Sequence, residues 1–382
     1  MAAIPAPGGR ASLVSRWRDG FHAWRNNLIA KAAFRDWAGR FPLTRRTSRR
    51  EAAALFDLAA GFVYTQILTA ACELDLFDHL AGGALPPDDV ASRLKLPRDG
   101  ALCLLRAAAA LDLVDERADG RFALGRRGAA LIDNRGVTAM IRHHRLLYRD
   151  LADPVALLRD PHRSTELSRF WTYAGTGADG PHLAAPDRYS ELMGVSQSFI
   201  ARDILDAHAV EGYARILDIG GGDGTFLKAV AARAPKAKLI LFDLPAVARI
   251  AEERLAAAGL ASRVEVIGGS FLSDPVPSGA DLITLNRVLH DHDDRDAAAL
   301  LRSIRAVCAP GTVLLLAEPM AGTPGARASG DAYFGFYLMA MRQGRPRSAE
   351  AITGMLRHAG FSRISEVATP MPLLVRVLIA RA

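Results

Sequence analysis

Hydrophobic and polar residues follow two different patterns along the chain, and the pattern changes near residue 211. Beyond that point, short apolar runs typical of buried strands alternate with amphipathic stretches of helical length. The strand-like runs lie at 214–220, 238–244, 263–269, 280–286, 312–319, 361–369 and 373–380. Alternating strands and helices joined by short turns predict an α/β domain with a doubly wound, seven-stranded sheet.

Residues 51–135 show a different pattern, with several short helices followed by a β-hairpin. A turn is predicted at 117–121, inside the hairpin. Helices followed by a hairpin are typical of a winged-helix module, which can bind DNA. The segment that would enter the DNA groove, 99–112, has Arg106 as its one basic residue, whereas phosphate contacts need several cations. We therefore expect a mainly helical, winged-helix-like dimerisation domain and no nucleic-acid partner.

The longest apolar run, residues 58–72, contains 15 residues. A membrane-spanning helix needs about 20, so this run is predicted to be a buried helix and no membrane span is expected. Residues 136–210 mix helical patterns with a Gly- and Pro-rich stretch at 175–187. We interpret this region as a helical linker.

The first 50 residues combine an aromatic stripe with a strong positive charge. Their apolar residues recur at helical spacing on one face, formed by Leu13, Trp17, Phe21, Trp24 and Leu28. The segment holds 11 Lys or Arg and two acidic residues, a net charge of +9, whereas the rest of the chain holds 37 basic and 39 acidic residues. Two interpretations remain open. Residues 12–50 contact an anionic membrane surface, or the helix packs on its own protein or on a partner subunit.

The cysteines indicate a reducing compartment. Cys72, Cys103 and Cys308 are odd in number and widely spaced, which does not fit a disulfide framework. The N-terminus lacks a basic stretch followed by an apolar core, so no secretory signal is predicted. We expect a cytoplasmic protein which, on the membrane interpretation, binds peripherally to the cytoplasmic face of the inner membrane.

The strongest motif is ILDIGGGDGTF at 216–226, where a predicted strand runs into a glycine-rich turn and then a helix. The dinucleotide pattern GxGxxG would require glycine at 225, where Thr225 stands. The glycines that permit close approach of a ligand to the backbone are Gly220, Gly222 and Gly224.

Two acidic residues near the glycine-rich turn indicate which kind of ligand it binds. Asp218, two residues before the first glycine, would repel a pyrophosphate but attract a ligand that carries an ammonium and a sulfonium. Asp243 ends the next predicted strand, where a carboxylate commonly accepts hydrogen bonds from ribose hydroxyls. Together with the glycines they predict S-adenosylmethionine (SAM) as the cofactor.

The fourth predicted strand ends at Asn286 and places the stretch RVLHDHDDRD (287–296) across the same crevice. Its histidines, His290 and His292, allow three interpretations: a general base with its supports, a metal site, or the polar start of a helix. We expect no metal, because no further ligands are convincingly spaced elsewhere. His292 is interpreted as a helix-start residue, and Asp293 or Asp294 as the cap of the following helix.

The motifs LDIGGGDGTF, LFDLP, RVLHDHDD, LLLAEPM and RHAGF resemble those of the dimeric SAM-dependent O-methyltransferases of plants and bacteria. The resemblance covers about residues 51–382 and implies the class I methyltransferase fold and a homodimer. It also implies that His290 is the general base and that Glu318 supports it. Asp291 is a further candidate for orienting the ring.

The chain departs from the family pattern in two places. Pro346 stands where the family carries a second supporting acid, so that support is absent or supplied elsewhere. Ser270, followed by Phe271, replaces an aspartate that often contacts adenine. We keep Ser270, Phe271 and Asn286 as candidate cofactor contacts.

Within the family, FPLTRR and ALFDLAAGFVYTQIL resemble the branch from purple photosynthetic bacteria that methylates the C1 tertiary hydroxyl of acyclic carotenoids. Such an acceptor is a long polyene, for which 331–343 offers an adaptable apolar wall. The predicted acceptor contacts are Met193, Phe334, Tyr337 and Met341. Three alternatives remain: a core role for 331–343, a phenolic or polyketide acceptor, and a winged-helix regulator that senses a ligand.

The predicted organisation has four parts. A basic N-terminal segment (1–50) precedes the dimerisation domain (51–135). A helical linker or substrate region (136–210) then leads to the SAM-binding catalytic domain (211–382).

Overall fold

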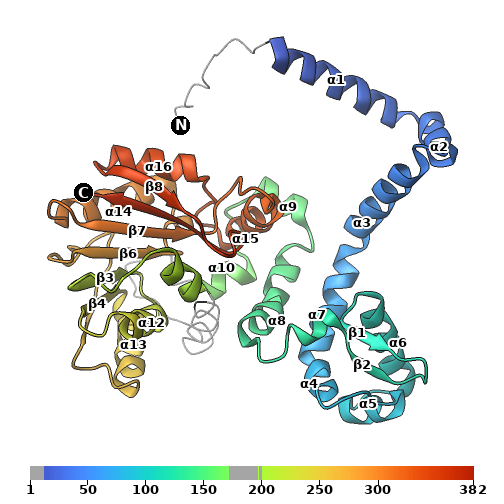
Figure 1. Cartoon of the computed structure of the whole chain (residues 1–382), viewed down its shortest axis with the longest axis horizontal. Helices are drawn as coiled ribbons and strands as arrows, with labels where there is room; N and C mark the ends of the chain where they lie inside the picture. Colours follow the sequence, from blue (N-terminus) through green and yellow to red (C-terminus); the bar gives the residue numbers. More distant parts are fainter. Residues whose placement is uncertain (1–12, 172–196, 198–199) are drawn as a thin grey trace.

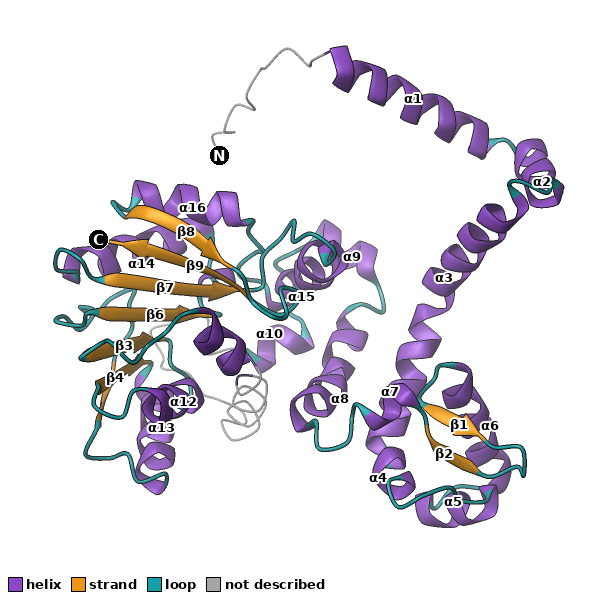
Figure 2. Cartoon of the chain, viewed as in Figure 1, coloured by secondary structure: helices purple, strands orange, loops and turns teal. Residues whose placement is uncertain are grey.

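The computed structural model describes residues 13–171, 197 and 200–382. Met193 and the stretch 175–187 lie outside the described residues. The chain forms two compact parts and a helical arm that extends away from both (Figure 1). The larger part carries a seven-stranded sheet, and the smaller one is helical with a two-stranded hairpin (Figure 2).

The large sheet confirms the predicted doubly wound architecture. Its strand order is β5-β4-β3-β6-β7-β9-β8, with β9 antiparallel to both of its neighbours and the first five strands parallel. The strands are β3 Arg215–Ile219, β4 Lys238–Asp243, β5 Val264–Gly268, β6 Leu282–Asn286, β7 Val313–Glu318, β8 Ser362–Val367 and β9 Arg376–Arg381. The order reverses between β3 and β6, and ligands bind at the carboxyl ends of strands at such a point.

Two hydrophobic clusters cover the two faces of this sheet. Ile216 packs on the face covered by α12 Thr225–Arg233 and α13 Pro245–Ala257. Leu217 packs on the face covered by α14 Asp294–Val307 and α16 Ala349–His358. Successive strand residues point to opposite faces, and both faces are buried. The strands are therefore continuous apolar runs.

The smaller part has the predicted order of helices followed by a hairpin. Its core includes Leu76, Phe77, Leu105 and Phe122. The elements are α4 Leu76–Leu80, α5 Pro87–Leu94, α6 Arg98–Ala110, β1 Val114–Glu116, β2 Phe122–Leu124 and α7 Arg126–Ala129. The buried core shows that this part packs as a unit.

Helix α3, Arg45–Glu73, differs from expectation in two ways. It is one continuous helix, and it runs through residue 50, where the sequence placed a boundary. The prediction that residues 58–72 are buried is wrong for most of their length, because Leu58 is 81% exposed and Phe62 is 71% exposed. The bundle covers only the end of the helix, near Cys72.

Helix α3 also bears on the expectation of no membrane span. Among the described residues, it is long and apolar enough to cross a membrane on length and composition alone, which one helix of this kind does not establish. Small and apolar residues continue upstream at 52–56, but Asp57 separates them from the apolar run of 15 residues.

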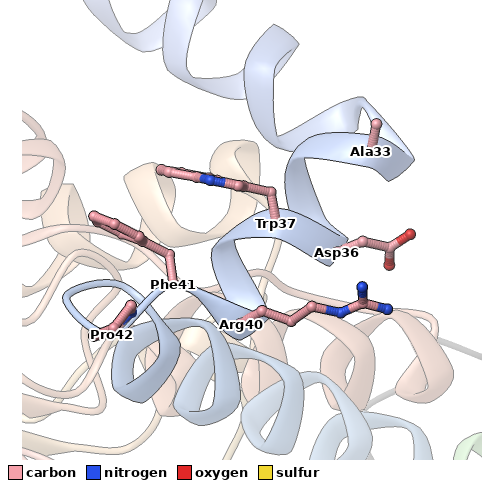
Figure 3. Close-up of a pocket in the computed structure, with 6 residues that line it drawn as sticks. All are labelled: Ala33, Asp36, Trp37, Arg40, Phe41 and Pro42. Atoms are coloured by element: carbon pink, nitrogen blue, oxygen red, sulfur yellow. The ribbon is translucent and has the colours of Figure 1, made fainter.

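The arm continues from α3 into α2 Ala32–Arg40 and α1 Leu13–Ala30. The predicted stripe is present on α1, where the rings of Trp17 and Phe21 stack with centroids 6.0 Å apart. Trp17 is 73% exposed and Trp24 60% exposed. At the end of α2, Trp37 and Phe41 lie side by side while Asp36 and Arg40 point the other way (Figure 3).

Between the two compact parts, the described residues up to 171 form helices α8 Arg135–Asp150, α9 Pro154–Arg159 and α10 Glu166–Phe170. They pack against a π-helical turn, η3 Ala328–Tyr333, and against α15 Phe334–Met341 of the larger part. The region predicted as a linker is therefore part of the wall beside the crevice.

Candidate active site

The glycine loop after β3 has the tight geometry that its motif predicts. Gly220, Gly222 and Gly224 have φ angles of +68°, +58° and +81°, which glycine adopts without steric cost. A Cβ atom on Gly220 would lie 2.4 Å from Cγ2 of Val288. The loop therefore touches the turn after β6 and brings two motifs distant in sequence together.

Asp218, near the end of β3, is buried beneath this loop. Its Oδ1 accepts hydrogen bonds from Oγ1 of Thr284 at 2.6 Å and Nδ2 of Asn286 at 3.3 Å. Its Oδ2, and Oδ1 of Asn286, are buried with no hydrogen-bond partner in the described part of the chain. Burial raises the pKa of Asp218 to about 7. Buried acceptors normally find donors, so these two atoms fit a ligand that carries a positive charge and N–H or O–H donors, as SAM does.

Asp243, at the end of β4, holds the same loop from the other side. Its carboxylate accepts hydrogen bonds from the backbone N–H of Gly222 at 2.8 Å and of Leu244 at 2.7 Å. Burial raises the pKa of Asp243 to about 6, although these two hydrogen bonds oppose the shift. The predicted ribose-binding acid thus lies against the glycine loop, as the predicted cofactor site requires.

His290 is buried on a 3₁₀ turn, η2 Leu289–Asp291, that follows β6. Its Nδ1 is hydrogen-bonded to Oε2 of Glu318, the last residue of β7. The other oxygen of Glu318 accepts from the backbone N–H of Val288 at 3.1 Å and of Leu289 at 2.7 Å. One carboxylate therefore orients both the turn and the ring, and Nε2 is the ring nitrogen left for proton transfer.

A second carboxylate lies on the Nε2 side of the ring. Oδ1 of Asp291 is 3.2 Å from Nε2 of His290. Burial on its own would lower the pKa of His290, but Asp291 and Glu318 outweigh it and raise the pKa above 6.5. Pro346 stands where the family carries its second acid. In this chain Asp291, the residue after His290, provides a carboxylate beside the ring.

The other polar residues of this motif have separate positions. Asp293 caps α14 by accepting a hydrogen bond from the backbone N–H of Asp296 at 2.9 Å, which confirms the predicted cap. His292 is buried and packs edge-on against the ring of Phe271, with centroids 5.1 Å apart. Within the described residues, no group of three or more His, Cys, Asp or Glu side chains is arranged to hold a metal ion.

Ser270 lies just after β5, at the same edge of the sheet. Its backbone N–H donates to Oδ2 of Asp274 at 2.7 Å, and its hydroxyl oxygen accepts from the N–H of Leu272 at 3.3 Å. In this structure the Ser270 side chain organises its own loop, so its contact with adenine stays a prediction.

The three predicted acceptor contacts on α15 lie at different depths. The ring of Phe334 stands edge-on to His290 with centroids 6.0 Å apart. Tyr337 and Met341 are buried in a cluster that includes Leu147 of α8 and Trp171. The structure thus brings Phe334 to the catalytic turn and places the other two within the packing behind it.

Two histidines on α8, which were not predicted from the sequence, are hydrogen-bonded to tyrosines of η3 and α15. Nε2 of His143 lies 2.9 Å from the hydroxyl of Tyr337, and Nε2 of His144 lies 2.8 Å from that of Tyr333. The indole N–H of Trp171 also donates to the Tyr337 hydroxyl, at 3.2 Å. Burial lowers the pKa of His143 to about 4 and lowers that of His144 as well. In the sequence, the sign of this role was that two histidines stand next to each other in an amphipathic helix.

The chain matches known protein families over most of its length. Residues 148–362 match the O-methyltransferase domain, and residues 56–134 match the O-methyltransferase dimerisation domain. The chain is 44% identical over 339 residues to the demethylspheroidene O-methyltransferase of Cereibacter sphaeroides, covering 88% of this chain and 89% of the relative. It is 42% identical over 339 residues to the enzyme of the same name from Rhodobacter capsulatus, covering 89% and 84%.

Solved structures agree with these matches. Human N-acetylserotonin methyltransferase in complex with SAM aligns with a TM-score of 0.72 and 25% identity, over 87% of this chain and 97% of that chain. Mitomycin 7-O-methyltransferase aligns with a TM-score of 0.72 and 25% identity, over 88% and 100%. The class I methyltransferase fold and SAM as cofactor are thereby confirmed, and the regulator alternative is not favoured. The chain belongs to the SAM-dependent O-methyltransferase family, with an N-terminal dimerisation domain.

Proposed function

We propose that this enzyme methylates the tertiary hydroxyl of an acyclic carotenoid, with His290 as its general base. The observation that carries the chemistry is the buried His290–Glu318 pair on a turn that touches the glycine loop through Val288 and Gly220. The acceptor class is supported by 44% and 42% identity to two demethylspheroidene O-methyltransferases.

The residues of the site divide the reaction between them. SAM, when bound, would supply a methyl group on a sulfonium, whose methyl C–S bond would break to release the neutral thioether S-adenosylhomocysteine as a good leaving group. Asp218 and Asn286 bind the cofactor's positive charge and donors, and Nε2 of His290 accepts the acceptor's hydroxyl proton as the new C–O bond forms. Glu318 and Asp291 stabilise the imidazolium that results. A base of this kind contributes about 10²–10⁴-fold, and alignment of the reacting atoms supplies much of the remainder.

The wall formed by η3 and α15 suits an apolar acceptor. Phe334 presents its ring beside His290. The hydroxyls of Tyr333 and Tyr337 are already hydrogen-bonded to His144 and His143, so these two tyrosines leave no unpaired hydroxyl beside the ring of Phe334. A polyene has no hydrogen-bonding groups along its length, and such a surface binds it without leaving a polar group unsatisfied.

The test is methyl transfer from labelled SAM to two acceptors in parallel, 1-hydroxyneurosporene and a simple phenol. We expect label in the carotenoid ether. Label in the phenol alone would reject the acceptor class while leaving the enzyme class intact. Folded His290→Ala is expected to lose about 10²–10⁴-fold in turnover, and full activity in that variant would remove His290 as the base.

We further propose that the enzyme works as a homodimer on the cytoplasmic surface of an anionic membrane. The dimerisation domain at 56–134 supports the dimer. The basic arm, with Trp17, Trp24 and Trp37 exposed, supports the membrane contact. An apolar acceptor dissolves in lipid, so an enzyme bound at the surface meets it at high local concentration.

A further inference from the structure

The loop between α15 and α16 contacts the backbone carbonyls of the catalytic turn. Within it, Arg347 is buried, with 1% of its side chain exposed. Its guanidinium donates to the backbone carbonyl of Leu289 at 2.7 Å and to that of His292 at 2.8 Å. It also donates to Oδ1 of Asp294 at 2.9 and 3.1 Å. Two carbonyls that flank His290 therefore depend on one arginine.

The backbone of the same loop contacts His290 directly. The N–H of Arg345 donates to the carbonyl of His290 at 2.9 Å. Gly344 has a φ of +79°, and a Cβ atom there would lie 2.0 Å from that carbonyl oxygen. The loop thus binds the carbonyls of Leu289, His290 and His292, and no side chain fits between Gly344 and the turn.

We propose that Arg347 is a positioning residue for methyl transfer, which holds His290 against Glu318 through the main-chain carbonyls of the turn. This inference rests on the proposed role of His290 as the base. Glu318 holds the turn by its N–H groups and Arg347 holds it by its carbonyls, so the backbone that carries His290 cannot shift relative to Glu318 without breaking one set of these hydrogen bonds. A planar guanidinium reaches all three acceptors at once, whereas the ammonium of lysine is a single point charge.

A purely structural explanation is that Arg347 neutralises Asp294, and Arg345 separates the two possibilities. The Arg345 guanidinium also binds Asp294, at 3.0 and 2.7 Å, but it is largely exposed. Its contact with the turn is made by its backbone N–H. Arg345→Gln therefore removes a cationic partner of Asp294 and leaves the hydrogen bonds to the turn in place, which makes it the matched control.

The experiment compares wild type, Arg347→Lys and Arg345→Gln by NMR titration of the His290 imidazole, assigned with His290→Gln. Asp291 and Glu318 together raise the pKa of His290 against the effect of burial. Because the hydrogen bond to Glu318 depends on the position of the turn, a loosened turn is expected to move the titration midpoint to lower pH in Arg347→Lys. In the same variant kcat falls about tenfold or more while the KM for SAM stays within about twofold, since the SAM contacts are unchanged. Arg345→Gln leaves midpoint and kcat as in wild type.

Two outcomes would overturn the proposal. One is a folded Arg347→Lys enzyme with an unchanged midpoint, and the other is an equal shift in Arg345→Gln. Arg347→Gln is the second variant if Arg347→Lys does not fold, because its amide reaches fewer of the three acceptors than the guanidinium does. An unchanged midpoint there would refute the loop's role as well. The titration needs no acceptor, so a wild type that methylates no carotenoid refutes the proposed substrate and leaves this test intact.

Discussion

As the proposed general base, His290 is expected to set the pH range in which the enzyme acts. A base must be unprotonated, and the carboxylates of Asp291 and Glu318 raise its pKa above 6.5 in spite of burial. Turnover is therefore expected to rise with pH along a limb centred above 6.5. Glu318→Gln removes one of the two negative charges, so the midpoint moves to lower pH, and kcat falls about tenfold or more as the ring loses its orienting partner. A pH–rate profile at saturating SAM checks this, and an unmoved midpoint would contradict it.

The proposed contact of Asp218 with SAM predicts that SAM affinity depends on pH. Burial raises its pKa to about 7, and a cationic ligand prefers the ionised carboxylate. Affinity is expected to fall below pH 7, by up to about tenfold per pH unit. Asp218→Asn weakens binding and flattens the pH dependence, which calorimetric titration between pH 6 and 8 measures. S-adenosylhomocysteine is the control, because it lacks the sulfonium charge and should show a shallower slope.

At the scale of elements, the α/β domain was predictable because buried parallel strands are continuous apolar runs. The pairing of His290 with Glu318 was implied by the family resemblance, and it is physically possible because the ends of parallel strands meet at one edge of the sheet. The contact of His143 with Tyr337 spans 194 residues, and an amphipathic pattern shows which face of α8 is buried but not what covers it. The contact of Arg347 with the catalytic turn was not predicted, because it is made to backbone carbonyls and the identity of the side chains in the turn does not reveal it.

The packing of α8 against α15 is expected to weaken in mild acid. Burial lowers the pKa of His143 to about 4 in the folded protein, against about 6.5 in an unfolded chain. Between these values the unfolded chain binds more protons, so the contribution of His143 to stability is complete above pH 6.5 and is lost as the pH falls toward 4.

Urea unfolding at pH 7.5 and 5.5 measures this effect. Wild type is expected to lose about 1 kcal/mol more than His143→Gln over this interval, because glutamine keeps a polar partner for Tyr337 but does not titrate. Equal losses in the two proteins would show that His143 does not carry the effect.

At the scale of the whole molecule, the burial of the helical arm was predicted wrongly. The composition of residues 58–72 predicts burial, yet burial depends on what lies beside a helix, and α3 projects from the bundle with Leu58 and Phe62 exposed. Exposed apolar residues that lie together on one helix mark a contact surface. The match to the dimerisation domain begins at residue 56, so α1, α2 and the start of α3 lie outside it. We therefore propose that a second subunit covers the apolar surface of α3, and that the basic charge of α1 and α2 attracts lipid headgroups.

Deleting residues 1–44, which ends just before α3, separates these two contacts. The deleted part carries seven Lys or Arg against two acids, together with Trp17, Trp24 and Trp37. Its loss is expected to abolish sedimentation with phosphatidylglycerol vesicles, while light scattering still shows a dimer. Wild-type binding should weaken between 0.1 and about 0.5 M salt, because the Debye length falls well below its value of about 10 Å at 0.1 M. If the truncated protein instead became monomeric, the arm would belong to the subunit interface. In the full-length protein, Trp17→Ser with Trp24→Ser keeps every charge, so reduced vesicle binding by that variant measures what the aromatic stripe adds to electrostatic attraction.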